Sequence, residues 1–165
     1  MRSYALLTLS LFGFVVGCVT SPVSPAASTA AATQKGSATF KRSGQQMVVE
    51  GIVNRKVRAN FLVDTGADLT IISLTTAKEL GITLHSKLPT VRLQTLAGSI
   101  YVPLVVLDSL EVGGMEVNDV TVAVYDSPIF DPYLPGPPGL LGRDFLNHFR
   151  VQIDLNEGFL RLEKK

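Results

Sequence analysis

Apolar and polar residues alternate with the two-residue period of β-strands along most of the chain after Thr39. Turn sequences that contain Gly or Asn separate these runs. The pattern predicts three hairpins, with arms at residues 46–53 and 57–63, 90–96 and 99–104, and 105–112 and 115–124. Shorter strands are predicted at residues 69–72, 151–154 and 159–162. The expected fold class is therefore mostly β.

Two short helices interrupt the strand pattern. Ser73 offers a cap for a helix over residues 74–80, and Gly81 can adopt the left-handed conformation that ends it. A second helix is predicted from Arg143 to about Phe149. Residues 126–139 form an irregular loop with five prolines, which fits a substrate cleft, a partner surface or a rigid connection.

The first 18 residues resemble the signal peptide of a bacterial lipoprotein. Arg2 provides a basic start, and the apolar run at residues 5–16 is too short to span a bilayer. The sequence Val15-Val16-Gly17-Cys18 is similar to a lipobox, in which cleavage before the cysteine leaves a thiol that receives lipid. The alternative is a plain secretory signal that happens to contain a cysteine. The pattern predicts an exported, periplasm-facing protein that is anchored through Cys18.

Residues 19–38 are Ser, Thr, Ala and Pro with few bulky side chains. We therefore expect a disordered tether that holds the folded domain, residues 39–165, away from the membrane surface. Val19 stands where an Asp would signal inner-membrane retention in some bacteria, which favours the outer membrane. Cys18 is the only cysteine, which excludes an internal disulfide, a cysteine-based metal site and a cysteine nucleophile in the domain.

The formal charge of the 165-residue chain is only +1, with 15 Lys and Arg residues scattered among 14 acids. A nucleic-acid binder would show a clustered basic face, so no nucleic-acid partner is expected. His85 and His148 are the only histidines, and they lack the spacing of metal ligands. The chain has neither the Gly-x-Ser-x-Gly motif of serine hydrolases nor a Gly-rich phosphate loop. No metal or organic cofactor is implied.

The candidate chemistry begins at Asp64, where an apolar arm delivers a carboxylate into the sequence Asp64-Thr65-Gly66. A carboxyl group beside apolar walls, next to a hydroxyl and to a glycine that permits close backbone approach, can serve as an acid or a base. Asp-Thr-Gly alone is also consistent with an ordinary polar turn. A second motif, Gly139-Leu140-Leu141-Gly142-Arg143, strengthens the functional interpretation.

Together these two blocks resemble the retropepsin family of retroviral-type aspartic proteases, over most of the chain. In that family an apolar strand leads into Asp-Thr-Gly-Ala, here Asp64 to Ala67, and an apolar-apolar-Gly sequence opens a short helix, here Leu140 to Gly142. The retroviral members continue with an Asp and an Arg, which are Asp68 and Arg143 in this chain. The resemblance implies a single-lobed, closed β-barrel or sandwich, in which Asp68 and Arg143 form an ion pair. Both residues follow apolar motifs that should pack together near the dimer interface, so we expect the pair to be partly buried. The alternative is two independent surface charges.

The same resemblance implies an aspartic endopeptidase. Hydrolysis of this type needs two carboxylates that share a proton around one attacking water, and no other Asp in the chain is followed by Thr-Gly. We therefore expect a twofold homodimer in which Asp64 of each subunit forms the dyad, while Thr65 and Gly66 fix the two loops against each other. The expected substrate is an extended polypeptide segment.

The hairpin at residues 90–104 has the place of a retropepsin flap, which covers the bound peptide. Leu96, Ala97 and Gly98 at its tip, together with Ala67 and Asp68 of the loop, are the expected substrate-binding residues. The tip has one glycine, unlike the glycine-rich retroviral flap, and an ordinary structural hairpin is the alternative.

Two other functions are left open. A retropepsin-like lipoprotein could be a catalytically silent peptide-binding or scaffold protein, in which Asp64 only structures its loop. A protease that needs a partner to dimerise is the third possibility. Retroviral subunits join through an intermolecular sheet of chain termini, and the strand predicted at residues 159–162 lies beyond that pattern. The resemblance therefore leaves the form of the dimer interface open.

Overall fold

Three hairpins form most of the sheet, as the alternating pattern predicts. β2 pairs with β3, β5 pairs with β6, and β6 continues into a pairing with β7. The bounds of these strands are Gln46–Val53 for β2, Val57–Val63 for β3, Thr90–Thr95 for β5, Gly98–Val112 for β6 and Met115–Val124 for β7.

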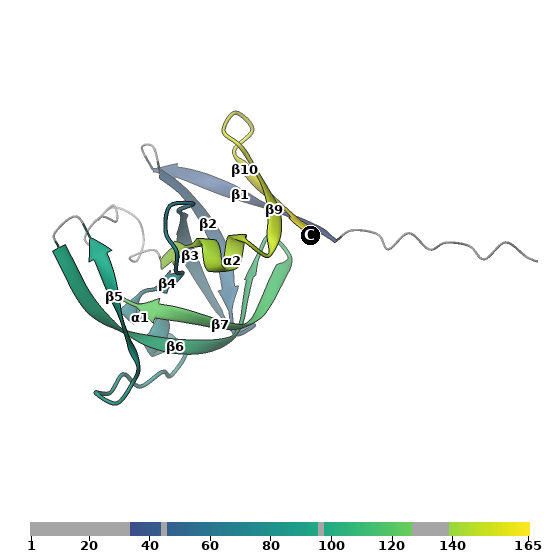
Figure 1. The fold of residues 1–165 in the computed structure, drawn as a ribbon. Coiled ribbons are helices and arrows are strands. Elements are labelled where there is room, and N and C mark those ends of the chain that lie inside the picture. Colours follow the sequence, from purple (N-terminus) through teal and green to yellow (C-terminus); the bar gives the residue numbers. More distant parts are fainter. Residues whose placement is uncertain (1–33, 44–45, 96–97, 127–138) are drawn as a thin grey trace, which may run out of the picture. The chain divides into compact units, whose positions relative to one another are not determined.

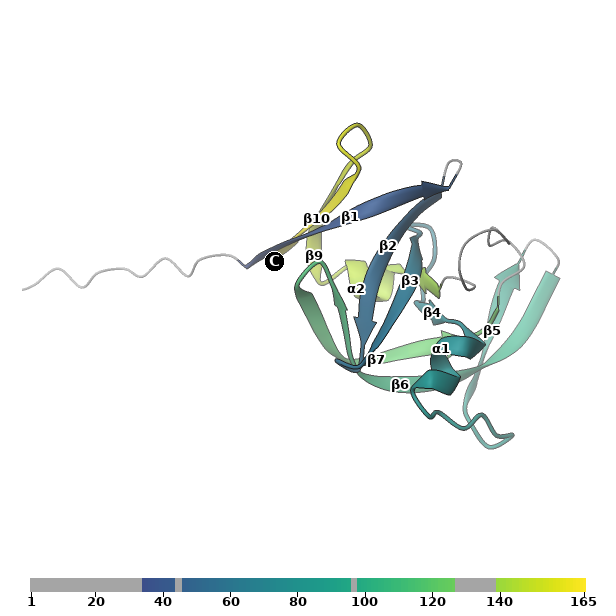
Figure 2. The same cartoon turned by 180° about the vertical axis from the view of Figure 1, so that it is seen from behind.

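The structure is a computed structural model that describes residues 34–165 except 44–45, 96–97 and 127–138. Within this part, one ten-stranded sheet has the order β5-β6-β7-β4-β8-β3-β2-β1-β10-β9 (Figures 1 and 2). The remaining strands are β1 (Lys35–Ser43), β4 (Ile71–Ile72), β8 (Gly139–Leu141), β9 (Phe149–Asp154) and β10 (Phe159–Lys164). β6 also pairs with β2, whereas β5 and β9 are the two ends of the sheet. The expected mostly β, single-lobed class is confirmed. The β6–β2 pairing links β6, β7, β4, β8, β3 and β2 into a ring of strands, and β5, β1, β10 and β9 lie outside it.

Two short helices accompany the sheet. α1 (Leu74–Glu79) begins after Ser73, whose hydroxyl accepts a hydrogen bond from a first-turn N–H at 3.0 Å, and Gly81 follows it with φ +74°. Local capping signals therefore predicted this helix correctly. α2 (Arg143–Leu146) is shorter than predicted, because the chain enters β9 at Phe149. Neither helix of the described part is long and apolar enough to cross a membrane.

β1 begins earlier than the apolar pattern indicates. The sequence predicts a domain start at Thr39, whereas β1 starts at Lys35 and pairs with β10 from its first residue. Gly36 explains the missing signal, because a Cβ there would lie 2.3 Å from the carbonyl oxygen of Gly113. The close approach of the β6–β7 turn thus excludes a bulky side chain. Any tether ends before Lys35, and residues 1–33, which include the predicted signal peptide, lie outside the described part.

β6 is one strand where the sequence predicts two, at residues 99–104 and 105–112. Up to Pro103 it pairs with β5, and from Leu104 onward it pairs with β7. The strand changes its partner without a break in the backbone. The predicted flap hairpin is therefore a direct extension of the central sheet.

The buried side chains form two groups. The main core contains the largest fully buried residues, among them Phe61, Phe145, Ile72, Leu107, Leu110, Met115, Leu141, Leu160 and Leu162. Burying each such side chain contributes roughly 1.5–3 kcal/mol. A smaller group, termed the second apolar cluster, consists of Leu62, Ile71, Val102, Ala123 and Leu140. This second cluster connects the strands around the candidate site with the β5–β6 hairpin.

Candidate active site

Asp64 directly follows the last residue of β3. That strand runs parallel to β8, with Val63 opposite Leu141, and the Asp64 N–H donates to the Leu141 carbonyl oxygen at 3.1 Å. The two strands end at the same edge of the sheet, where β8 leads through Gly142 into α2 (Figure 1). The two sequence motifs therefore lie next to each other in space.

The loop after β3 holds the Asp64 carboxylate in one orientation. The Gly66 N–H donates to Asp64 Oδ1 at 2.8 Å, and the Ala67 N–H donates to the Asp64 carbonyl oxygen at 3.3 Å. A Cβ at position 66 would lie only 3.1 Å from Oδ1, so the glycine permits this contact. Asp64 is half-buried, whereas Thr65 and Gly66 are exposed. Among the described residues, nothing binds Asp64 Oδ2, so one carboxylate oxygen is fixed and the other is uncommitted.

Glycines of the second motif let the two motifs touch. A Cβ on Gly142 would lie 2.6 Å from the Leu69 carbonyl carbon, and a Cβ on Gly139 would lie 2.4 Å from the Ile71 carbonyl oxygen. Both obstacles are backbone atoms, which cannot swing aside as a flexible side chain can. The glycines of Gly-Leu-Leu-Gly therefore serve the close packing of β8 against the chain that follows Asp64.

A buried network that the sequence does not predict connects the same chain segment to α2. The Thr70 hydroxyl donates to Asp144 Oδ1 at 2.6 Å, and the Thr70 N–H donates to Oδ2 at 2.9 Å. The hydroxyl oxygen in turn accepts the Gly142 N–H at 3.1 Å, and Asp144 Oδ1 accepts the Phe145 N–H at 2.8 Å. The only sequence signal is a short polar residue beside each motif, and such residues are common at turns and helix caps.

Asp68 and Arg143 also meet at this junction. Arg143 Nη2 forms an ion pair with Asp68 Oδ1, and the Arg143 N–H donates to the Ala67 carbonyl oxygen at 2.8 Å. The side chains are 84% exposed for Asp68 and 51% exposed for Arg143, whereas the sequence predicts a partly buried pair. In a single chain the pair is a surface contact, worth about 1 kcal/mol or less.

The described part of the predicted flap contains Gly98, whereas Leu96 and Ala97 lie outside it. Gly98 has φ +117°, and its carbonyl oxygen accepts a hydrogen bond from Thr95 Oγ1 at 2.7 Å. Ala67 of the Asp64 loop packs against the second apolar cluster, and so do three half-buried residues of the hairpin, Val91, Leu93 and Ile100. The hairpin and the Asp64 loop therefore share one apolar cluster.

The other two carboxylates at this junction already have partners. Asp68 pairs with Arg143, and Asp144 accepts three hydrogen bonds. Within the described ranges, no three His, Cys, Asp or Glu side chains gather as metal ligands would, and both histidines are exposed. At this junction one chain thus presents a single uncommitted carboxylate, that of Asp64.

Comparisons with known proteins agree with this geometry. A family model described as aspartyl protease matches residues 49–145, more than half of the chain and both motifs. Among solved structures, the crystal structure of a retropepsin-like aspartic protease from Rickettsia conorii is 26% identical, with a TM-score of 0.60. The match covers 80% of this chain and 93% of that chain. No curated protein matches the sequence. The chain therefore belongs to the aspartyl protease family and has a retropepsin-like fold.

Proposed function

We propose that this protein is an aspartic endopeptidase that cleaves extended polypeptide segments as a homodimer, with Asp64 of each subunit forming the catalytic dyad. The observation that carries the proposal is the setting of Asp64. Its carboxylate is half-buried at the end of β3, held through one oxygen by the Gly66 N–H and uncommitted at the other. The aspartyl protease family match covers this loop and the motif that packs against it.

A second subunit is needed because the chemistry requires two carboxylates. Asp68 and Asp144 are engaged by Arg143 and Thr70, so neither is available as the partner of Asp64 within the described chain. In a homodimer, a twofold axis next to the loop brings two copies of Asp64 together, so a single sequence supplies both carboxylates.

In the proposed dyad, one carboxylate is protonated and the other is ionised. Two carboxylates in close contact cannot both ionise easily, so the pair holds one shared proton. The ionised member takes a proton from the attacking water, and the protonated member donates to the carbonyl oxygen of the scissile bond. The Gly66 N–H bond to Oδ1 orients each carboxylate before the substrate arrives.

The direct test compares wild type with Asp64→Asn on a diverse peptide library read by mass spectrometry. The amide preserves the shape of the side chain and still accepts the Gly66 N–H, but it cannot act as a base. Cleavage should fall by about a hundredfold or more. Asp108→Asn, which alters an exposed carboxylate on β6, is the matched control and should cleave like wild type. Undiminished cleavage by Asp64→Asn would overturn the mechanism.

Dilution tests the shared site. Specific activity should fall as the protein is diluted, because the dyad exists only in the dimer. A strictly monomeric sample that still cleaves would reject the homodimeric dyad. If wild type binds peptides of the library and cleaves none, the silent peptide-binding alternative stands, with Asp64 acting only as an acceptor within its loop.

We also propose that lipid on Cys18 holds the protein in the cell envelope, facing the periplasm. The lipobox-like sequence at residues 15–18 and the Ser, Ala and Pro-rich stretch after it support this placement. Cys18→Ala should release the protein from the membrane fraction and leave peptide cleavage unchanged, whereas Ser21→Ala should change neither. A wild-type protein that is wholly soluble after export would contradict the anchor.

A further inference from the structure

The described part of the sheet ends at β9, close to the C-terminus. β10 is the only described strand that pairs with β9, and β10 in turn pairs with β1. The described ends of the chain are thus paired with each other inside one subunit. An interface built by exchanging terminal strands between subunits would have to break these pairings, whereas no described strand pairs with the outer edge of β9.

The sequence of β9 is complementary to itself in the antiparallel direction. Because side chains alternate across a strand, Arg150, Gln152 and Asp154 share one face, while Val151 and Ile153 lie on the face that packs against the main core. If two copies of β9 pair with Gln152 opposite Gln152, Arg150 stands opposite Asp154 of the partner subunit. In the same register, Val151 stands opposite Ile153 of the partner subunit.

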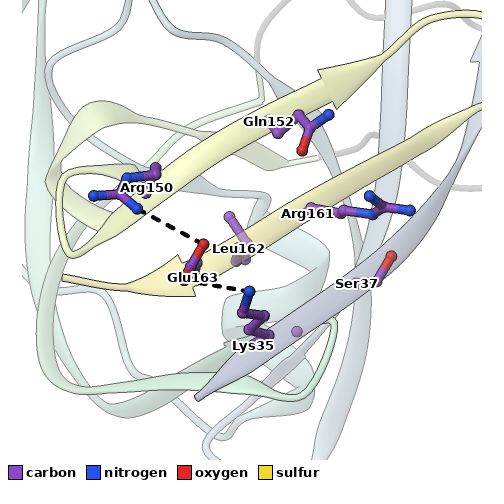
Figure 3. A pocket seen from close by; sticks show the side chains of 8 residues that line it. Lys35, Ser37, Arg150, Gln152, Arg161, Leu162 and Glu163 are labelled. Carbon is purple, nitrogen blue, oxygen red and sulfur yellow. Dashed lines mark ion pairs between the residues drawn. The ribbon is translucent and has the colours of Figure 1, made fainter. Parts of the chain in front are cut away.

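The charged face of β9 is open to such a partner. The Arg150 side chain is 79% exposed, and its contact within the chain is a 3.9 Å ion pair with Glu163. Asp154 Oδ1 accepts the N–H groups of Asn156 and Glu157 in the β9–β10 turn, and no described residue binds its Oδ2. Figure 3 shows Arg150 and Gln152 on β9, beside Arg161 on the neighbouring β10.

α2 connects the β9 edge to the Asp64 loop. α2 is held to that loop by the bond from the Arg143 N–H to the Ala67 carbonyl oxygen and by the Thr70–Asp144 network. β9 begins at Phe149, just after α2 ends at Leu146. Phe145 of α2 and Phe149 of β9 contact each other, with ring centroids 5.2 Å apart. A subunit docked on β9 is therefore positioned relative to Asp64 through one short, packed segment.

From these observations we infer that the partner at β9 is a second copy of this chain, paired antiparallel with its own β9 and centred on Gln152. At the interface the strands then follow the order β1-β10-β9-β9-β10-β1, which joins the sheets of the two subunits with no strand exchanged. This inference rests on the proposed homodimer, whose interface it specifies. Pairing also removes the exposed edge, which would otherwise recruit other chains.

Charge reversal tests the register, using the full chain with Cys18→Ala and analytical ultracentrifugation. Arg150→Glu places a carboxylate opposite Asp154 of the partner subunit twice in each dimer, so the dimer dissociation constant should rise about tenfold or more. Asp154→Asn keeps the Oδ1 acceptor of the turn but removes the charge. It should weaken the dimer in the wild-type background and strengthen it in the Arg150→Glu background. Arg161→Glu, on the same face but one strand inward, should leave the constant within about threefold.

Cross-linking provides a second test that does not depend on charge. Residues opposite each other in an antiparallel pair have Cα atoms about 4.5–5.5 Å apart, which a disulfide can span. In the Cys18→Ala background, Gln152→Cys should form a covalent dimer on mild oxidation. Arg161→Cys should not, because its twofold mate lies three strand spacings away, about 14 Å.

These two experiments distinguish a failure of the β9 interface from a failure of the proposed peptidase function. Absence of the Gln152→Cys cross-link, or an Asp154→Asn effect of the same sign in both backgrounds, overturns the β9 interface even if the protein is a dimeric protease. A cross-linked and charge-sensitive dimer that cleaves no peptide supports the interface and counts against the peptidase proposal alone.

Discussion

Thr70 and Asp144 are 74 residues apart in the chain and share two hydrogen bonds, from the Thr70 hydroxyl at 2.6 Å and from its N–H at 2.9 Å. Thr70 is fully buried and follows the Asp64 loop, whereas Asp144 lies in the first turn of α2. Because the Thr70 hydroxyl also accepts the Gly142 N–H, one side chain joins both sequence motifs. The geometry of the candidate site thus depends on a contact outside the Asp-Thr-Gly motif itself.

Thr70→Val should lower the free energy of unfolding by about 3 kcal/mol. Valine has the same shape, but it removes a bond to a charged acceptor and leaves the buried Gly142 N–H without its partner. Urea unfolding followed by circular dichroism measures the loss. Thr121→Val, at an exposed position of β7, is the control and should change stability by less than about 0.5 kcal/mol. A Thr70→Val protein as stable as wild type would show that the network contributes nothing.

Gly142→Ala should be more damaging than an alanine at a glycine in open space. The added Cβ would lie 2.6 Å from the Leu69 carbonyl carbon, so β8 or the chain after Asp64 must shift, at a cost of about 3 kcal/mol. Gly114→Ala is the matched control. Gly114 has φ +80° with no atom near the new methyl group, so only backbone strain of about 1 kcal/mol is expected. Equal losses for the two variants would contradict a role of Gly142 in packing the motifs together.

Local sequence signals predict the elements that depend on contacts between residues close together in the chain. Ser73 caps α1 and Gly81 adopts the left-handed conformation after it, as the sequence alone indicates. The hairpins follow from alternation, because one-sided burial of a sheet leaves that pattern in the sequence. Asp64 and Gly142 were found because their motifs match a family pattern, which carries information about tertiary contacts that no single stretch contains.

Features that depend on contacts between distant segments could not be predicted where the family pattern does not include them. The Thr70–Asp144 network has no periodicity or spacing of its own, since either residue would serve equally well as a cap or turn residue. Gly36 weakens the strand signal of β1 because its small size is required by a turn elsewhere in the chain. The continuity of β6 depends on its exchange of β5 for β7 as partner, which the residues around Pro103 do not encode.

Acid should destabilise the fold partly through Glu116. Arg55 donates two hydrogen bonds to its carboxylate, at 2.9 and 2.6 Å, and the bond from Arg55 lowers the pKa of Glu116 below its ordinary value of 4.5. The unfolded chain then binds the proton more readily than the folded chain. The stabilisation is therefore present above pH 4.5 and is lost as the pH falls through that value and the lower folded pKa.

Glu116→Gln should flatten the dependence of stability on pH below about 4.5, as measured by urea unfolding across a pH series. Glu79→Gln, on the exposed side of α1 and without a described ion-pair partner, is the control and should preserve the wild-type slope. An unchanged slope in Glu116→Gln would show that the Arg55 contact does not persist in solution.

The exposed Asp68–Arg143 pair leads to a prediction that separates folding from assembly. Within one chain the pair is a surface contact, so Arg143→Lys should change the free energy of unfolding of the dilute protein by less than about 1 kcal/mol. In the proposed homodimer a partner subunit approaches the Asp64 loop and excludes water from the pair. There a lysine replaces a planar, multiply donating guanidinium with a single ammonium group. The dimer dissociation constant should therefore rise about tenfold or more, and peptide cleavage at a fixed protein concentration should fall with it.

Arg58→Lys, in the comparably exposed pair with Glu50, is the control and should alter neither quantity. Unchanged dimer affinity in Arg143→Lys would deny the pair a role in assembly, and a large loss of stability in the dilute protein would show instead that the pair supports the fold of the single chain.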